Sequence, residues 1–211
     1  MINVLLVDDH VLIRKGIALL LENHVDIAVV GEANDGEEAI QLAYQTEPDV
    51  ILMDISIPNG LDGFTATKEI KKNLPHIKVI LLTMHDEVAY IQQAIDIEAD
   101  GYILKNSQGG IMYEAILSVY HGKTYYEVGL PQEQLEKLFK NKGNPKTDVL
   151  STREREIVRL TILGYSNIQI AEKLFISAKT VENHKANSMK KLNLKSKAEL
   201  IQYGIANGYI Q

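Results

Sequence analysis

Five polar residues in the first half of the chain have the chemistry of a phosphoryl-accepting site. Asp8, Asp9 and Asp54 offer carboxylates, Thr83 offers a hydroxyl, and Lys105 offers an ammonium. Carboxylates gathered in one crevice repel one another, so such a site should raise a pKa or bind a divalent cation. Mg²⁺ suits a site of carboxylates, waters and a phosphate oxygen. With that charge neutralised, Asp54 could attack a phosphoryl group and Thr83 could hydrogen-bond one of its oxygens.

The elements that must position these residues are strands. Apolar runs at residues 3–7, 50–53, 78–82 and 101–104 each lead directly into members of the set. Continuous apolar runs are typical of parallel strands that are buried on both faces. If these strands are parallel neighbours, as the helical segments between them require, their polar ends converge on one edge. Any one of these residues alone could instead be an ordinary loop residue.

The same region predicts a complete alternation of strands and helices. A further strand is expected at residues 26–32. Five strand–helix units indicate a doubly wound parallel sheet, whose ligands bind at the carboxyl ends of the strands. Helices are expected at residues 11–22, 35–45, 63–74, 87–98 and 108–120.

Four local motifs resemble the receiver domain of bacterial response regulators. They are Leu-Leu-Val-Asp-Asp-His at 5–10, Asp-Ile-Ser-Ile-Pro at 54–58, Leu-Leu-Thr-Met-His at 81–85 and Ala-Asp-Gly-Tyr-Ile-Leu-Lys at 99–105. The resemblance covers residues 1–123 and implies a flavodoxin-like, five-stranded sheet. It also implies that a sensor histidine kinase transfers a phosphoryl group to Asp54, with Thr83 and Lys105 assisting. Asp8, Asp9, Asp54 and the backbone carbonyl of Ser56 would hold Mg²⁺.

The resemblance assigns roles to three further residues. Ser56 and His85 would flank the phosphoryl group and influence its lifetime, although His85 could equally be a plain surface residue. Tyr102 would turn inward as Thr83 moves, which would couple the site to a distant face, although a strand aromatic often has only a packing role. One departure from the pattern is an extra residue, assigned to Asn59, between Asp54 and Gly63. An insertion in this turn should be tolerated.

Composition and charge limit the class of protein. The chain has 211 residues and no Cys, which fits a cytoplasmic protein without disulfides, and no apolar run is long enough to span a membrane. Residues 1–125 carry 8 Lys and Arg against 19 Asp and Glu, a balance of −11, whereas residues 148–211 carry 10 against 6, a balance of +4. A basic second half favours nucleic acid as its partner.

The second half is predicted to be a small all-α domain of four helices at residues 149–211. Residues 124–148 read as a linker with a short amphipathic helix. Ser/Thr-x-x-Glu/Gln capping boxes begin at Ser151, Ser166 and Ser196, and Ser177 is a simpler N-cap. Residues 168–175, a short turn and a basic helix from Ala178 form a helix-turn-helix. A solvated charged helix would look similar.

This module resembles the LuxR-type DNA-binding domain, so that the whole chain resembles the NarL/FixJ class of response regulators. The matching motifs include Leu-Ser-Thr-Arg-Glu-Arg-Glu at 150–156 and Lys-Thr-Val-Glu-Asn-His at 179–184. The last helix would pair subunits on DNA through Leu200, Ile201 and Tyr203, which could instead be core residues. The residues expected at the DNA are Lys179, Thr180, Glu182, Asn183, Lys185, Ala186, Lys190 and Lys191.

The resulting hypothesis is a transcriptional regulator that dimerises and binds promoter DNA when phosphorylated, with RNA polymerase as a further candidate partner. It would not be a turnover enzyme. One rival is a phosphohydrolase of the haloacid dehalogenase type, which needs a second acid where this chain has Ser56. Another is a receiver that ignores phosphate and acts through a protein partner.

Overall fold

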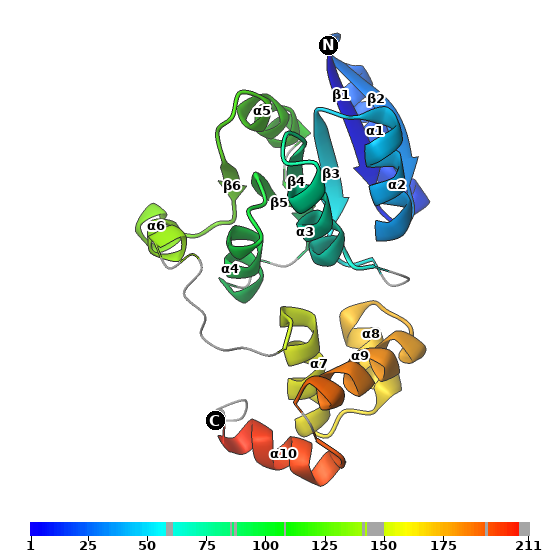
Figure 1. Cartoon of the computed structure of the whole chain (residues 1–211), viewed down its shortest axis with the longest axis vertical. Coiled ribbons are helices and arrows are strands. Elements are labelled where there is room, and N and C mark those ends of the chain that lie inside the picture. The colour runs from blue at the N-terminus through cyan, green and yellow to red at the C-terminus, as the bar shows by residue number, and fades with distance from the viewer. Residues whose placement is uncertain are drawn as a thin grey trace. The chain divides into compact units, whose positions relative to one another are not determined.

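The computed structural model describes residues 1–57, 61–84, 86, 88–107, 109–140, 142, 150–192 and 194–206. The chain divides into two compact units, Met1–Gly143 and Asn144–Gln211 (Figure 1). Within the described part of the chain, no helix is long and apolar enough to cross a membrane.

The first unit is built on one parallel sheet of strands in the order β2-β1-β3-β4-β5-β6. The order of the first five strands is that of flavodoxin-like folds, so the predicted fold class is confirmed. Residues of β3 are buried throughout, as expected for a strand covered on both faces. The strands are β1 (Ile2–Val7), β2 (Ile27–Ala33), β3 (Val50–Asp54), β4 (Lys78–Thr83), β5 (Gly101–Leu104) and β6 (Tyr125–Glu127).

Helices cover both faces of this sheet. Residues of α2, α3 and α4 pack into one apolar cluster with one face of the strands, and residues of α1 and α5 pack into a second cluster with the other face. This arrangement is the doubly wound architecture that the alternating pattern predicts. The helices are α1 (Val11–Glu22), α2 (Gly36–Thr46), α3 (Gly63–Asn73), α4 (Val88–Asp96) and α5 (Gly109–Tyr120).

The expectation of five strands is wrong by one, because β6 adds a sixth strand beside β5. Its three residues pair in parallel register with β5, Tyr102 lying opposite Tyr126. A strand this short has no recognisable periodicity, and its pairing is set by tertiary contact rather than by local sequence. A short helix, α6 (Gln132–Lys140), follows and packs against the cluster on the α4 side. The segment that we expected to be a linker therefore contributes a strand and a helix to the first unit.

The second unit is all-helical, as predicted. Two small clusters of buried apolar residues hold its helices together, one around Ile157, Ile170 and Val181 and the other around Val158 and Leu200. The helices are α7 (Thr152–Ile162), α8 (Asn167–Leu174), α9 (Ala178–Lys191) and α10 (Lys197–Ala206).

Helix starts in this unit follow the predicted caps. Complete capping boxes form at Ser151 and Ser166, and the Ser177 hydroxyl accepts from the backbone N–H of Thr180. At Ser196 the hydroxyl accepts from the Glu199 N–H, but the Glu199 carboxylate accepts from the N–H of Lys195 instead of from that of the cap residue. All four helices therefore have a local signal for where they begin.

Candidate functional site

The carboxyl ends of four parallel strands bring the predicted phosphoryl-site residues to one edge of the sheet. Asp54 is the last residue of β3 and Thr83 the last of β4, and both side chains are buried. Asp8 and Asp9 directly follow β1, and Lys105 directly follows β5. The convergence that the apolar runs predict is thus present in the fold.

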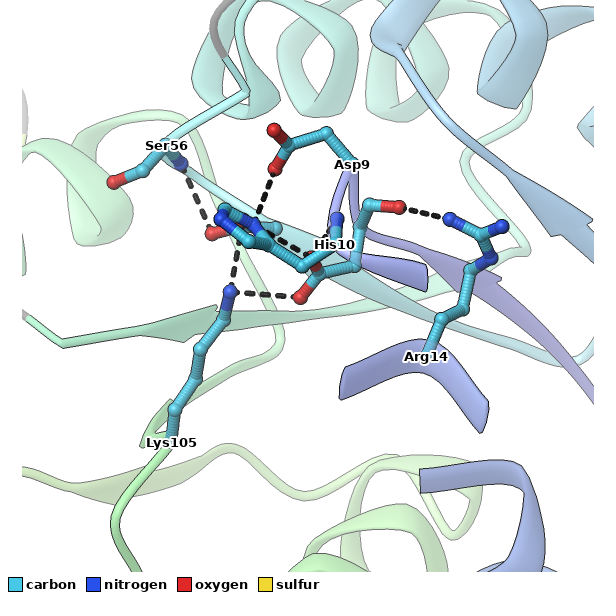
Figure 2. Close-up of polar contacts among 7 residues, drawn as sticks. Asp9, His10, Arg14, Ser56 and Lys105 are labelled. Atoms are coloured by element: carbon cyan, nitrogen blue, oxygen red, sulfur yellow. Dashed lines mark hydrogen bonds and ion pairs between the residues drawn. The ribbon is translucent and has the colours of Figure 1, made fainter. Parts of the chain in front are cut away.

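Lys105 links the two most buried carboxylates. Its Nζ lies 2.7 Å from Oδ2 of Asp8 and 2.8 Å from Oδ2 of Asp54 (Figure 2). Burial lowers the pKa of the Lys105 ammonium, but its charge interaction with Asp54 and its hydrogen bonds to Asp54 and Asp8 outweigh burial, and the net pKa is raised. Lys105 therefore remains charged and holds the two strand ends together.

The pKa of Asp54 is raised mainly by burial. Burial raises the pKa of its carboxyl group, and the charge of Asp8 adds to this, whereas Lys105 and the backbone N–H of Ser56 act in the opposite direction. The contact with Lys105 acts on the two pKa values in opposite directions: it raises the pKa of Lys105 and lowers that of Asp54, but burial outweighs it at Asp54. The pair attracts strongly, but one ammonium does not compensate for two buried carboxylates. The site therefore has an excess of negative charge that a cation would relieve.

The donor set fits a hard divalent cation. One ligand atom from each of Asp8, Asp9, His10 and Asp54 lies within 4.8 Å of the others. Carboxylate oxygens are the preferred protein ligands of Mg²⁺. The backbone N–H of Ser56 donates to Oδ1 of Asp54 over 3.0 Å. The acidic pocket at this edge is therefore consistent with a metal site.

Two residues at the site carried no prediction of their own. Nδ1 of His10 lies 2.8 Å from Oδ1 of Asp9 and 3.4 Å from Oδ1 of Asp8. Arg14, buried on α1, donates to the backbone carbonyl of Asp8 (Figure 2). It also pairs with Glu32 of β2. His10 stood within a recognised motif, but Arg14 occupies a core-facing helix position that apolar periodicity alone does not identify.

Of three further predicted residues, the structure describes only Tyr102. His85 and Asn59 lie outside the described residues. Tyr102 is fully buried on β5, three residues before Lys105. Its ring lies parallel to that of Tyr126, with the centroids 6.3 Å apart. Tyr102 is therefore an inward-facing residue in this structure rather than half-buried.

Gly63 contacts the phosphoryl-site strand even though it is one residue further from Asp54 than the receiver pattern predicts. A Cβ built on Gly63 would lie 2.0 Å from the carbonyl oxygen of Asp54 and 2.8 Å from Cα of Ile55. Asp62 caps α3 by accepting from the N–H of Thr65. The start of α3 is therefore held directly against the end of β3.

The helix-turn-helix of the second unit presents part of the predicted DNA set. Exposed residues of α9 and its start include Lys179, Glu182, Asn183, Ala186 and Lys190. Lys179 and Glu182 form an ion pair of 2.9 Å on this exposed surface. These residues lie on the second helix of the motif, the helix that enters the major groove in such proteins.

Other members of the predicted DNA set make contacts within the unit. The hydroxyl of Thr180 is buried and lies 2.7 Å from that of Ser177, so it belongs to the helix cap. Nζ of Lys185 donates to Oδ1 of Asn167 on α8 over 2.9 Å. Burial lowers the pKa of the Lys185 ammonium, and the positive charge of Lys197 adds to this. These two side chains position α9 as well as being candidates for DNA contact.

Lys191 joins the end of α9 to the start of α7. Its Nζ lies 2.7 Å from Oε2 of Glu154, whose carboxylate also accepts from the backbone N–H of Ser151. Burial raises the pKa of Glu154, but the bonds from Lys191 and Ser151 outweigh it, so that the net pKa is lowered. A single carboxylate thus completes the capping box and ties two helices together.

This carboxylate should make the second unit less stable in acid. Because the folded-state pKa of Glu154 is lowered, its stabilising effect is present above the unfolded-state pKa and is lost as the pH falls through the folded-state value. Glu154→Gln keeps an acceptor for Ser151 but loses the ion pair, and should cost about 1 kcal/mol at neutral pH, since Lys191 is partly exposed. Urea unfolding followed by NMR signals of α7 would measure this.

The same comparison in acid provides the control. The deficit of Glu154→Gln relative to the unsubstituted chain should shrink once the carboxylate is protonated, and Lys191→Gln should show a similar pH dependence. A deficit that does not change with pH would show that the charge of Glu154 contributes nothing to the stability of this unit.

The residues predicted to pair subunits on α10 differ in burial. Leu200 is buried in the cluster with Val158 and Ile162, so it is a core residue, which was the alternative for this stripe. Ile201 and Tyr203 are half-buried. A pairing surface on α10 therefore rests on these two residues.

Taken together, a flavodoxin-like unit with an acidic edge and a helix-turn-helix unit define a phosphoryl-responsive DNA-binding regulator. Two family descriptions match the chain: the response regulator receiver domain over residues 4–117, and the bacterial regulatory proteins of the luxR family over residues 148–204. The chain belongs to the LuxR-type two-component response regulators, a family of DNA-binding transcriptional regulators and not of turnover enzymes.

Similar proteins agree over nearly the whole length. The chain is 41% identical over 208 residues to the oxygen regulatory protein NreC of Staphylococcus carnosus, covering 96% of each chain. It resembles a structure of the RcsB response regulator of Salmonella typhimurium with a TM-score of 0.58 and 30% identity, covering 96% of this chain and 98% of that one. An RcsB–DNA complex matches with a TM-score of 0.58 and 29% identity, covering 96% of both chains.

Proposed function

We propose that Asp54 is the phosphoryl acceptor through which a sensor histidine kinase controls DNA binding by this chain. The observation that carries the proposal is the contact of Lys105 with both Asp8 and Asp54 at the carboxyl edge of the sheet. A buried carboxylate beside a fixed ammonium and further acidic groups is suited to form an acyl phosphate.

We propose that the phosphoryl group passes directly from the kinase to Asp54. A carboxylate oxygen of Asp54 forms a bond to phosphorus while the bond between phosphorus and the imidazole nitrogen of the kinase phosphohistidine breaks. The bonding electron pair stays on that nitrogen, which then takes up a proton. Lys105 would move from the free carboxylate to a phosphoryl oxygen, and the Thr83 hydroxyl would donate to another.

The metal site would be formed by Asp8, Asp9, Asp54 and the backbone carbonyl of Ser56. A bound Mg²⁺ would supply positive charge for the transferring phosphoryl oxygens. The role of Asp8 and Asp9 is to hold it beside Asp54. Ser56 and His85 would influence how quickly the phosphoryl group is lost, because they stand two residues beyond Asp54 and Thr83. Tyr102 and Thr83 would form the switch that reports the modification to the rest of the unit.

DNA binding would use the exposed side of α9. Glu182, Asn183 and Ala186 would approach base edges, and Lys179, Lys190 and Lys191 would contact bases or phosphates. Thr180 and Lys185 would support this surface, and Lys185 would in addition reach DNA. RcsB has been solved as two dimers bound to two parallel DNAs. We propose that this chain, too, binds as a dimer when phosphorylated, with Ile201 and Tyr203 on the pairing side and Leu200 in the core beneath them.

The experiment for this function measures DNA affinity as a function of phosphorylation. Selection from random duplex DNA would supply a binding sequence, and its affinity would then be measured before and after treatment with acetyl phosphate and Mg²⁺. Treatment should tighten binding and steepen the binding curve, and Asp54→Ala should abolish both effects. Equal affinities of treated protein, untreated protein and Asp54→Ala would contradict the proposal. The partners in the cytoplasm would then be promoter DNA and RNA polymerase without a phosphate switch.

One substitution tests the DNA surface itself. Lys185→Ala should weaken DNA binding by roughly 1 kcal/mol or more, and the salt dependence should become shallower because one phosphate contact is lost. The measurement is the affinity for the selected duplex at several salt concentrations. Lys137→Ala, which removes the same charge from the first unit, should leave the affinity unchanged.

A second variant separates contact from packing. Asn167→Ala removes the acceptor that Lys185 uses within the unit but keeps the cation. If Asn167→Ala weakens binding as much as Lys185→Ala and leaves the salt dependence unchanged, Lys185 acts by positioning α9 and not by contacting DNA.

A further inference from the structure

The segment that joins the two units is folded onto the first unit as a strand and a helix. β6 extends the sheet at its β5 edge, and α6 follows it as the last described helix before the second unit. Leu135, Leu138 and Phe139 lie on one face of α6 at helical spacing and pack against the apolar cluster on the α4 side of the sheet. The connection between receiver and DNA-binding domain is therefore itself an interacting element.

Aromatic rings connect α6 to the interior of the sheet. The rings of Tyr102 and Tyr126 stack 6.3 Å apart, and the ring of Tyr126 meets that of Phe139 edge to face at 5.0 Å. The Tyr126 hydroxyl donates to the carbonyl of Ala99 over 2.9 Å, which fixes the ring. Phe139 thus rests on a residue that is packed directly against fully buried Tyr102.

Two polar contacts between described residues add to this docking. Nε2 of Gln92 on α4 donates to the carbonyl of Leu138 over 3.4 Å. The ion pair between Lys142 and Glu98, at 2.8 Å, is exposed and contributes little. No residue of α6 is fully buried. A nine-residue helix is marginal alone in water, so α6 depends on its packing against the first unit and should unfold when that packing is lost.

β5 connects this aromatic contact to the candidate phosphoryl site, because Tyr102 lies on β5 and Lys105 directly follows it. β5 has only four residues, and Lys105 comes directly after it, with Nζ 2.8 Å from Asp54. α6 is docked in the same structure in which Nζ of Lys105 contacts the carboxylate of Asp54. A phosphoryl group on Asp54 would occupy space beside that ammonium, so Lys105 and the end of β5 would have to shift. A shift of β5 disturbs the pairing of Tyr102 with Tyr126, on which Phe139 rests.

We propose that α6 is a docked helix that is released from the α4–β6 side of the receiver when Asp54 is phosphorylated, the signal passing from β5 through Tyr102 and Tyr126 to Phe139. This inference rests on the proposed function of Asp54. It adds an element with two positions, docked and released, which is what coupling between separated sites requires. Because coupling is reciprocal, release of α6 should in turn favour the phosphorylated form of the site.

Hydrogen exchange of the peptide 132–140 tests the release directly. The full chain is treated with acetyl phosphate and Mg²⁺, the phosphoryl adduct is verified by intact mass, and exchange is followed by mass spectrometry. Exchange of α6 should accelerate by about fivefold or more on phosphorylation, and should not change in Asp54→Ala. Absence of an adduct would count against the proposed function. A full adduct with unchanged or slower exchange of α6 would overturn the inference alone.

Phe139→Ala tests the same coupling from the other side, with exposed Lys137→Ala as the matched control on this helix. Without any phosphoryl donor, Phe139→Ala should already show fast exchange of α6. It should also bind beryllofluoride, a mimic of the phosphoryl group, about fivefold or more tightly than the unsubstituted chain in the presence of Mg²⁺. Lys137→Ala should change neither quantity. Fast exchange of α6 with unchanged beryllofluoride affinity would show that docking is independent of the phosphoryl site.

Discussion

Gly63→Ala should destabilise the first unit by about 3 kcal/mol, because there is no space for a methyl group where α3 begins. The added Cβ would lie 2.0 Å from the carbonyl oxygen and 2.9 Å from the carbonyl carbon of Asp54. These are backbone atoms of a buried strand end, which cannot rotate away as a side chain could. Relief of the clash would shift α3 or the end of β3, so phosphorylation of Asp54 should slow as well. Urea unfolding and the rate of adduct formation would measure the two effects.

Gly110→Ala is the control for Gly63→Ala. A Cβ on Gly110, in the first turn of α5, would meet nothing within 4 Å. Because Ala favours helix more than Gly does, this variant should be neutral or more stable by up to about 1 kcal/mol. Equal effects of the two substitutions would mean that the contact of Gly63 with Asp54 does not limit the fold.

Lys105→Met should lower the free energy of unfolding of the first unit by about 3 kcal/mol in the absence of Mg²⁺, because buried Asp8 and Asp54 then lose their shared cation. Saturating Mg²⁺ should restore much of this loss, since a cation that binds the folded state stabilises it. Phosphorylation should be slowed strongly even with Mg²⁺ present. Urea unfolding with and without Mg²⁺ and the rate of adduct formation test these three expectations.

The loss of stability in Lys105→Met should depend on pH. The pKa of Asp54 is already raised by burial, and removal of Lys105 takes away the largest opposing influence. A carboxyl group with a raised folded-state pKa destabilises the fold when ionised, and that effect disappears as the pH falls below the folded-state value. The deficit of Lys105→Met should therefore shrink in mild acid and in the double variant with Asp54→Asn. A deficit that neither acid nor Asp54→Asn reduces would show that Lys105 stabilises the unit by packing alone.

The meeting of the candidate phosphoryl-site residues at one edge could be predicted because it follows from the order of the strands. Once the four apolar runs are parallel neighbouring strands, the polar residues that follow them have to meet at one edge of the sheet. These residues are Asp8, Asp54, Thr83 and Lys105. In the structure Lys105 contacts Asp8 and Asp54, and ligand atoms of Asp8, Asp9 and Asp54 lie within 4.8 Å of one another, as that reasoning requires. Burial on both faces of β3 makes the apolar pattern easy to recognise.

The features that sequence reasoning missed depend on tertiary contact. β6 is too short for periodicity, and it forms because β5 offers an unpaired edge. Thr180 has the residue type of its predicted surface but turns inward, because a helix of this small unit must bury one side. Leu200 is in the core, which was the alternative given for it. Arg14 is a buried cation whose partner, Glu32, lies on another element. The spacing of residues within a single segment does not predict these features.

Intact mass after incubation with acetyl phosphate shows whether Asp54 accepts a phosphoryl group with the help of Mg²⁺. The full chain should gain one phosphoryl group when Mg²⁺ is present. It should gain none when Mg²⁺ is removed by a chelator or when Asp54 is replaced by Ala. An adduct of equal size on Asp54→Ala, or no adduct on the folded unsubstituted chain, would contradict the account.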